Sequence, residues 1–116
     1  MTESLKLTVD DQRDGLAVIY TDGYINNQGG EEIARVAYKL IDGGSKKLLL
    51  NLAKTKIVNS IGISILIEII EKMMEIDGKL AFCSLTPTIE KTFNIMGLAQ
   101  YAGIYPDEQA ALEGLK

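Results

Sequence analysis

The polar pair Asn59-Ser60 carries a side-chain amide and a hydroxyl at a predicted helix start, where such groups can cap the helix or accept a phosphate. The pair follows the loop 53–58 and directly precedes a helical pattern. Asn or Ser at a helix start accepts a backbone N–H hydrogen bond, and such a cap contributes about 1 kcal/mol. The same position also suits an anion, because free N–H groups and the positive end of the helix dipole stabilise negative charge. The pair is therefore a helix cap, or a place where a phosphate on Ser60 is tolerated.

The supply of catalytic side chains is small. The 116 residues include no histidine, so no imidazole is available as a general base or a metal ligand. The single cysteine, Cys83, lies between Phe82 and Ser84 in a short apolar segment, where a thiol is more often inert core than nucleophile. Ser60 lacks a histidine to activate it, and no glycine-rich loop leads into Lys-Ser or Lys-Thr. We therefore predict no enzymatic activity, no metal and no cofactor.

Charge and length limit the location and the partners. Twelve Lys and Arg against sixteen Asp and Glu give a net charge of −4, the wrong sign for neutralising a nucleic-acid backbone. Residues 1–11 lack the basic and apolar regions of a signal peptide, and a lone cysteine suits a reducing compartment. The longest apolar-dominated run, residues 61–70, is far shorter than the roughly 20 residues that cross a bilayer. We expect a cytoplasmic protein of one domain, residues 1–116, without nucleic-acid binding or membrane insertion.

Hydropathy periodicity supplies the elements that must position these residues. Strands are expected at 5–9 and 16–20, and a helix with a one-sided apolar stripe at 33–41 follows the glycine- and asparagine-rich loop 21–30. Residues 47–52 contain three consecutive leucines, which is typical of a central strand buried on both faces. From residue 62 to 75 the polar side chains form one narrow stripe, which predicts a helix buried everywhere else. Met73 and Met74 are expected in the core.

The second half continues the alternation of strands and helices. A strand is expected at 79–84, followed by a helix that Thr86 caps, Pro87 opens and Gly97 ends. Residues 104–105 indicate a last short strand, and Pro106-Asp107 opens a final helix. Strands that alternate with helices imply right-handed crossovers, so we predict an α/β protein with a mainly parallel sheet. Ligands of such sheets bind at the carboxyl ends of the strands, where the loops 23–30 and 53–62 lie.

Two motifs resemble those of the STAS domain family, the sulfate-transporter and anti-sigma-factor-antagonist fold. The first is Asn51-Leu52-Ala53-Lys54-Thr55-Lys56-Ile57-Val58-Asn59-Ser60-Ile61-Gly62-Ile63. Its family form is Asp-Leu-Ser, a few residues, an apolar pair, then Asp-Ser-Ser/Thr-Gly-Leu-Gly, and the spacing across residues 51–62 matches without a gap. The second is the segment 23–26, which resembles the family's Gly-x-Leu-Asp. The resemblance covers essentially the whole chain. It implies a four- to five-stranded, mixed and mainly parallel sheet with about four helices, mostly on one face.

The resemblance also implies a mechanism. Stand-alone members of the family bind a serine-kinase anti-sigma factor and so free the sigma factor. The kinase phosphorylates the serine at the start of the buried helix, here Ser60, and the complex falls apart; a PPM-type phosphatase restores the active form. The charge that a phosphate adds makes such a switch physically sound. The partner-binding residues implied here are Gly23, Tyr24, Asn26, Asn27, Asn59, Ser60, Ile61, Gly62 and Ser64.

The motifs depart from the family pattern at several positions. Asn26, Asn51 and Asn59 stand where the family has aspartates. Ile61 replaces a small hydroxyl residue, and Ser64 replaces a glycine. Without a carboxylate beside the acceptor serine, the chain would be phosphorylated slowly, or would bind a partner without being phosphorylated.

Two alternatives remain open. One is a non-phosphorylated STAS docking subunit of another assembly, a lipid-transport ATPase complex or a stressosome-like scaffold, in which the same surface docks a partner constitutively. The other is an enzyme or small-ligand sensor, in which a glycine-bordered loop beside a helix start holds an anion.

Overall fold

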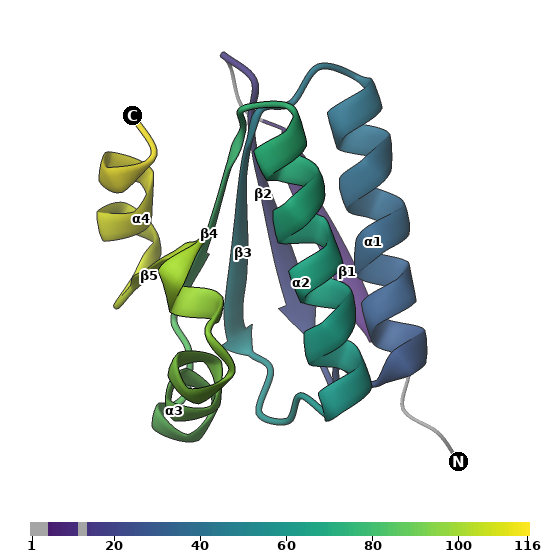
Figure 1. Ribbon diagram of the computed structural model, residues 1–116, viewed down its shortest axis with the longest axis vertical. Coiled ribbons are helices and arrows are strands. Elements are labelled where there is room, and N and C mark those ends of the chain that lie inside the picture. Colours follow the sequence, from purple (N-terminus) through teal and green to yellow (C-terminus); the bar gives the residue numbers. More distant parts are fainter. Residues whose placement is uncertain (1–4, 12–13) are drawn as a thin grey trace.

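A mixed five-stranded sheet forms the centre of the protein in the computed structural model, which describes residues 5–11 and 14–116 (Figure 1). The strands follow each other across the sheet in chain order, and β1 is antiparallel to β2 while β2 to β5 are parallel. They are β1 (Lys6–Asp11), β2 (Leu16–Asp22), β3 (Lys47–Lys54), β4 (Lys79–Cys83) and β5 (Gly103–Tyr105). The predicted α/β class and mainly parallel sheet are confirmed.

Helices cover both faces of the sheet, but unequally. They are α1 (Asn27–Asp42), α2 (Ser60–Glu75), α3 (Pro87–Met96), a 3-10 turn η1 (Leu98–Gln100) and α4 (Glu108–Gly114). The helices α1 and α2 lie side by side on one face (Figure 1), and α3 packs into the same core. The smaller core on the other face is covered by α4. The predicted unequal distribution of helices is therefore confirmed.

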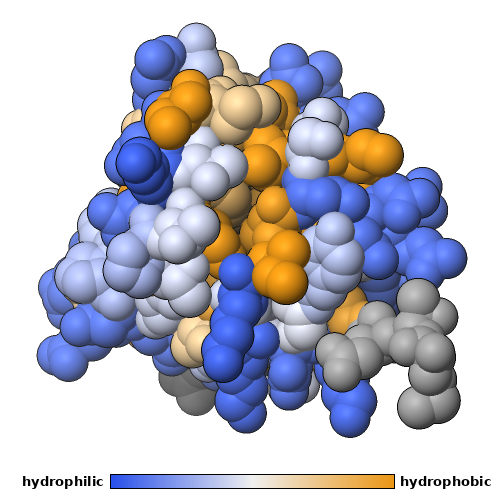
Figure 2. All heavy atoms as spheres, turned by 90° about the horizontal axis from the view of Figure 1, so that it is seen from below, coloured by the Kyte–Doolittle hydropathy of each residue, from blue (hydrophilic) through white to orange (hydrophobic). Residues whose placement is uncertain are grey.

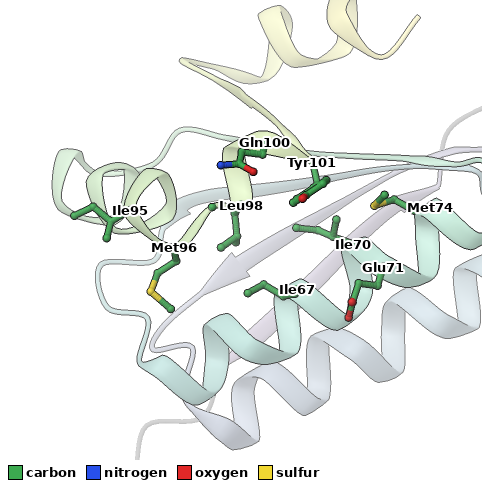
Figure 3. A pocket seen from close by; sticks show the side chains of 10 residues that line it. Ile67, Ile70, Glu71, Met74, Ile95, Met96, Leu98, Gln100 and Tyr101 are labelled. Carbon is green, nitrogen blue, oxygen red and sulfur yellow. The ribbon is translucent and has the colours of Figure 1, made fainter.

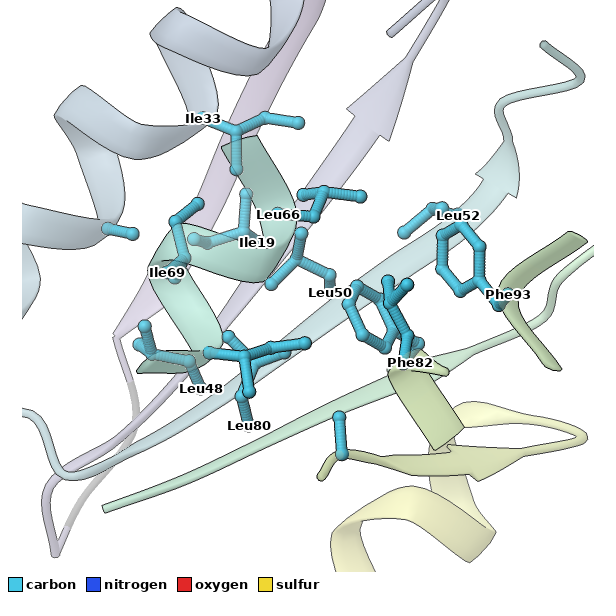
Figure 4. Packing of buried hydrophobic residues seen from close by; sticks show 14 of the residues in the cluster. Ile19, Ile33, Leu48, Leu50, Leu52, Leu66, Ile69, Leu80, Phe82 and Phe93 are labelled. Carbon is cyan, nitrogen blue, oxygen red and sulfur yellow. The ribbon is translucent and has the colours of Figure 1, made fainter. Parts of the chain in front are cut away.

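The strand β3 shows why three leucines follow one another. Leu48 and Leu50 pack into the larger core, whereas Leu49 points to the smaller core beneath α4. All three are fully buried, as expected of a central strand covered on both faces. Figure 4 shows the larger core, where Phe82 and Phe93 meet edge to face with ring centroids 5.0 Å apart. That ring pair attaches α3 to the sheet.

The start of α1 differs from the prediction. Residues 27–30, expected to be loop, form the first turn of the helix, and Gly29 and Gly30 are buried there. A Cβ on Gly29 would lie 2.8 Å from the Tyr24 carbonyl oxygen, and one on Gly30 would lie 2.8 Å from Ile65 Cδ1. The glycines thus allow the helix to pack closely, and reading them as part of a loop was wrong.

The burial of α2 also differs from the prediction. Ile61 and Met74 are exposed, although the polar stripe predicted an otherwise buried helix. Met73 is buried as expected, but Met74 is not part of the core. Met74 is exposed because α3 and η1 leave part of the α2 flank open. Ile61 is seven residues before the exposed Glu68 and so lies on the same outward face of α2.

Candidate functional site

The polar pair at the start of α2 divides two roles between two side chains. Asn59 has an extended backbone, and its side-chain oxygen accepts a hydrogen bond from the Gly62 N–H at 2.7 Å. The cap predicted for this pair is therefore Asn59. Ser60 is the first residue of the helix and is exposed. Its hydroxyl thus stands at the surface, at the positive end of the α2 dipole.

The start of α1 repeats this arrangement. Asn26 has an extended backbone, and its side-chain oxygen accepts the Gly29 N–H at 2.8 Å. Both caps require an acceptor oxygen, which an amide supplies as well as a carboxylate. Asparagine in place of the aspartates of the family pattern at positions 26 and 59 therefore leaves both helix starts capped.

The loops before the two helices are joined to each other. Ile25 and Val58 form a parallel bridge, in which the Ile25 N–H donates to the Ile57 carbonyl and the Asn59 N–H donates to the Ile25 carbonyl, each at 3.0 Å. The Gly23 N–H donates to the Lys54 carbonyl at 3.1 Å. Backbone groups paired in this way extend the β2–β3 ladder beyond the sheet, so the two loops form one ordered surface.

Gly62 lies where this surface is most crowded. A Cβ at this residue would lie 2.5 Å from the Ile25 carbonyl oxygen and 3.0 Å from the Ile25 side chain. Gly30 faces it from α1, since a Cβ there would lie 3.5 Å from the Gly62 Cα. The glycine that follows Asn59-Ser60-Ile61 is therefore required for the close approach of α2 to the loop before α1.

Two exposed apolar residues stand close to Ser60 in the sequence, one three residues before it and one directly after it. Ile57 is 58% exposed and Ile61 is 54% exposed. Seen from the end where α1 and α2 begin, apolar side chains form a band through the middle of the face, between polar ones (Figure 2). A small hollow of about 300 Å³ adjoins the loops, lined by Asp22, Gly23, Tyr24, Lys54, Lys56 and Ile57. Apolar contacts bordered by charges are typical of protein-binding surfaces.

The residues expected to bind a partner lie together at this end of the sheet. Those from the segment 23–27 are at or beside the start of α1, and those from the segment 59–64 are at the start and in the first turns of α2. The Ser64 hydroxyl donates to the Ser60 carbonyl at 3.0 Å and is exposed one turn into α2. The set comprises Gly23, Tyr24, Asn26, Asn27, Asn59, Ser60, Ile61, Gly62 and Ser64, of which Gly62 is buried.

Comparison with known proteins agrees with this architecture. The family model of the STAS domain matches residues 8–111, which is most of the chain. The chain belongs to the STAS domain family. This STAS domain is 23% identical over 112 residues to a Bordetella bronchiseptica protein named "Putative anti-sigma factor antagonist BtrV", with 97% of this chain and 96% of that protein covered.

Solved structures share the fold. An anti-sigma factor antagonist from Mycobacterium paratuberculosis superposes with a TM-score of 0.84 at 21% identity, over 97% of this chain and 94% of that one. The Bacillus cell fate determinant SpoIIAA, in its phosphorylated form, superposes with a TM-score of 0.76 at 17% identity, over 96% and 100% of the two chains. The STAS domain described here therefore has the fold of anti-sigma factor antagonists.

Asn51 has a different role from the other two motif asparagines. It points to the α4 face, where its side-chain N–H donates to Glu108 Oε1 at 3.1 Å. Its side-chain oxygen accepts the Ala53 N–H at 3.0 Å. This amide thus attaches α4 to the sheet and lies outside the surface around Ser60. Sequence reasoning missed this contact, because no local pattern signals a pairing between residues 57 positions apart.

Tyr20 completes the polar cluster beneath α4. It is the register neighbour of Asn51 on β2 and packs against the smaller core. Burial, and then a hydrogen bond to Glu108 and the charge of that carboxylate, raise the pKa of Tyr20 to about 12. The cluster therefore favours the neutral form of Tyr20.

The remaining candidate groups lie away from the surface around Ser60. Cys83 is buried in the smaller core, and burial raises the pKa of its thiol, which agrees with its predicted inert role. Within residues 5–11 and 14–116, the structure shows no group of three or more His, Cys, Asp or Glu side chains placed to hold a metal ion. Over the same ranges, no helix is both long and apolar enough to span a bilayer.

Proposed function

We propose that this STAS domain is an anti-sigma factor antagonist that binds a serine-kinase anti-sigma factor and is released when Ser60 is phosphorylated. The observation that carries the proposal is the exposed Ser60 at the first position of α2, beside two loops that the Ile25–Val58 bridge joins into one surface. The anti-sigma factor antagonist SpoIIAA, which has the same fold and whose structure is solved in an unphosphorylated and a phosphorylated form, supports this proposal.

The physical chemistry of Ser60 suits a reversible switch. A phosphate adds about two negative charges at neutral pH. At the start of α2 the free N–H groups and the helix dipole stabilise that charge, so the fold persists. The same charge lies on the surface that faces the partner, where contact with acidic groups becomes repulsive. A PPM-type phosphatase would remove the phosphate and restore binding.

The amide of Asn59 affects the expected rate at which a kinase phosphorylates Ser60. It caps α2, as an aspartate would, but it brings no charge to the neighbourhood of the Ser60 hydroxyl. A carboxylate at this position could orient the Mg²⁺ or a basic residue of a kinase. We therefore expect slow phosphorylation of the natural chain and faster phosphorylation of Asn59→Asp.

A docking role without phosphorylation is the second candidate. The exposed Ile57 and Ile61 beside Ser60 favour it, because an apolar contact of this kind does not depend on a change of charge. The docking partner would then be a component of a larger assembly, such as an ATPase or a scaffold, and no kinase or phosphatase would act on the chain.

One experiment separates the two candidates. The chain is incubated with Mg-ATP and the serine-kinase anti-sigma factor encoded in the same genome, and phosphate is mapped by mass spectrometry. We expect phosphate on Ser60 and none on Ser60→Ala. Ser64→Ala tests the other exposed serine in the first turns of α2, and its phosphate should still map to Ser60.

Affinity for the same kinase provides the second measurement. Calorimetric titration should show at least tenfold weaker binding of Ser60→Glu. Binding of Thr88→Glu should be unchanged, because Thr88 is exposed in the first turn of α3 and lies outside the predicted partner-binding set. Absence of phosphate at Ser60, together with undiminished affinity of Ser60→Glu, would contradict the switch and leave the docking role. An unchanged phosphorylation rate in Asn59→Asp would show that the missing carboxylate has no effect.

A further inference from the structure

A groove runs between α2 and the segment formed by the end of α3 and η1, on the flank of the molecule. Its volume is about 580 Å³. Figure 3 shows Leu98 and Tyr101 facing Ile67 and Ile70 across it, with Ile95 and Met96 at the α3 end and Met74 further along α2. The lining residues are Ile67, Ile70, Glu71, Met74, Ile95, Met96, Gly97, Leu98, Gln100 and Tyr101.

The groove exposes large apolar side chains that the core does not use. Ile95 is 73% exposed and Tyr101 is 62% exposed, and Met74 and Met96 are each exposed by about half. Apolar surface gathered in this way marks an interaction site more often than single exposed residues do. Methionine side chains, with several rotatable bonds, adapt to the shape of a partner.

One acidic side chain lines the groove on the α2 side, and two more stand close to it on the same helix. Glu71 lines it, and Glu68 and Glu75 stand three and four residues away on the same helix. After burial, these three carboxylates are the groups that raise the pKa of Tyr38 on the neighbouring α1, so their charges act together. Lys72 Nζ lies 3.7 Å from Glu75 Oε2, and Lys91 stands four residues before Ile95 on α3.

The shape of the groove suits a helix. Its α2 wall presents Ile67, Ile70 and Met74, spaced by three and four residues, along about 10 Å of helix axis. An amphipathic helix places apolar side chains at the same intervals, and its polar flank would lie beside Glu71, with Glu68 and Glu75 about one turn to either side along α2. Basic side chains on that flank would complement the acidic border.

We propose that this groove docks an amphipathic helix of a protein partner, whose apolar face carries side chains at i, i+3 or i+4, and i+7 and whose flank toward α2 carries Lys or Arg. A second copy of this chain is a poorer occupant, because pairing two grooves brings the carboxylates of one α2 against those of the other. An anionic membrane is disfavoured by the same charges.

This proposal does not depend on phosphorylation. On α2, an interval of seven residues separates Ser60 from Ile67 and Ile67 from Met74, so these three residues lie on one face of the helix. The groove therefore continues the surface that begins at Ser60. A partner helix in the groove would add contacts to that surface whether Ser60 is modified or not. The test below uses neither a kinase nor a Ser60 variant, so its failure and that of the phosphorylation switch are distinguishable.

The probe is a fluorescein-labelled synthetic peptide of about four helical turns, with Leu at i, i+3, i+4, i+7 and i+11 and Lys on one flank. A matched peptide has Glu in place of each Lys. Fluorescence anisotropy measures affinity, and amide chemical shifts of the labelled chain locate the bound peptide. We expect the Lys peptide to bind at least tenfold more tightly than the Glu peptide, with shifts confined to α2, α3 and η1.

Variants of the chain test the contacts. Ile95→Lys, which replaces an exposed groove residue, and Glu71→Lys should each weaken binding of the Lys peptide at least tenfold. Val9→Lys is the control, because Val9 is an exposed apolar residue on β1, away from the groove, and binding should be unchanged. Circular dichroism checks that each variant is folded.

Several results would overturn the proposal. Equal binding of the two peptides would show that charge does not contribute to binding. Chemical-shift changes centred outside the groove would show that the peptide binds elsewhere. Concentration-dependent sedimentation that Ile95→Lys abolishes would identify a second copy as the occupant. Tighter association with phosphatidylserine vesicles than with the Lys peptide would identify a membrane surface instead.

Discussion

The hydrogen bond between Asn51 and Glu108 explains why asparagine suits position 51, where the STAS motif usually has aspartate. The Asn51 side-chain N–H donates to the Glu108 carboxylate at 3.1 Å, while the side-chain oxygen accepts the Ala53 N–H. An aspartate keeps the second interaction and loses the first, because an ionised carboxylate has no proton to donate. Asn51→Asp therefore replaces a hydrogen bond with two facing carboxylates.

The size of the effect follows from the geometry. Loss of a hydrogen bond to a charged group costs about 1.5–3 kcal/mol. Two like charges 4 Å apart repel by about 4 kcal/mol at an effective dielectric constant of 20. Both side chains are partly exposed, so water screens most of that repulsion and the side chains can turn apart. We expect Asn51→Asp to lower the free energy of unfolding by about 2–3 kcal/mol at pH 7.

The sign of the pH dependence is specific to this pair. Repulsion makes the folded variant hold a proton more tightly than the unfolded chain does, so the stability deficit is largest at neutral pH. As the pH falls, protonation of either carboxyl removes one charge and restores a donor. The deficit relative to the natural chain should therefore shrink between pH 7 and about pH 4.5.

Urea unfolding of four chains at both pH values measures these differences. The chains are the natural one, Asn51→Asp, Glu108→Gln and the double variant. In the double variant the amide introduced at position 108 can donate to the carboxylate introduced at position 51, so most of the lost stability should return. The role assigned to this contact would be refuted if Asn51→Asp were as stable as the natural chain at pH 7. It would also be refuted if the double variant were no more stable than Asn51→Asp.

Two further predictions concern the cluster beneath α4 and the start of α2. Absorbance titration of the folded chain should show Tyr20 ionising with a pKa of about 12. Its phenol, neutral in the fold, should contribute stability below pH 10 that is lost as the pH rises toward 12. Tyr20→Phe should remove this late step of the absorbance titration, and a late step that persists in the variant would contradict the assignment. Gly62→Ala should lower the free energy of unfolding by about 1–3 kcal/mol, because the new Cβ would meet the Ile25 carbonyl 2.5 Å away. The control is Gly43→Ala at the exposed end of α1, where the nearest atoms are 3.5 Å away, and equal losses in the two variants would show that crowding at Gly62 is not the cause.

Local patterns predicted much of the fold, and the exceptions have identifiable causes. Periods of two and 3.6 residues located the strands and helices, and the cap at Thr86 with Pro87 after it marked α3 correctly. The same reasoning misread Gly29 and Gly30, because a buried glycine that permits close packing has the same local appearance as one in a loop. It also placed Met74 in the core, since periodicity shows that a position is apolar but not whether a neighbouring element covers it.

The sequence by itself determined the order of the elements, the capped start of α2 and the position of Ser60 there. These properties depend on residues within a few positions of each other along the chain. Only the tertiary structure decided that the two loops join through Ile25 and Val58, that Asn51 faces α4, and that α3 and η1 leave a groove beside α2. Such contacts link segments that are distant in sequence, and their pairing depends on how the crossovers stack the helices on the sheet.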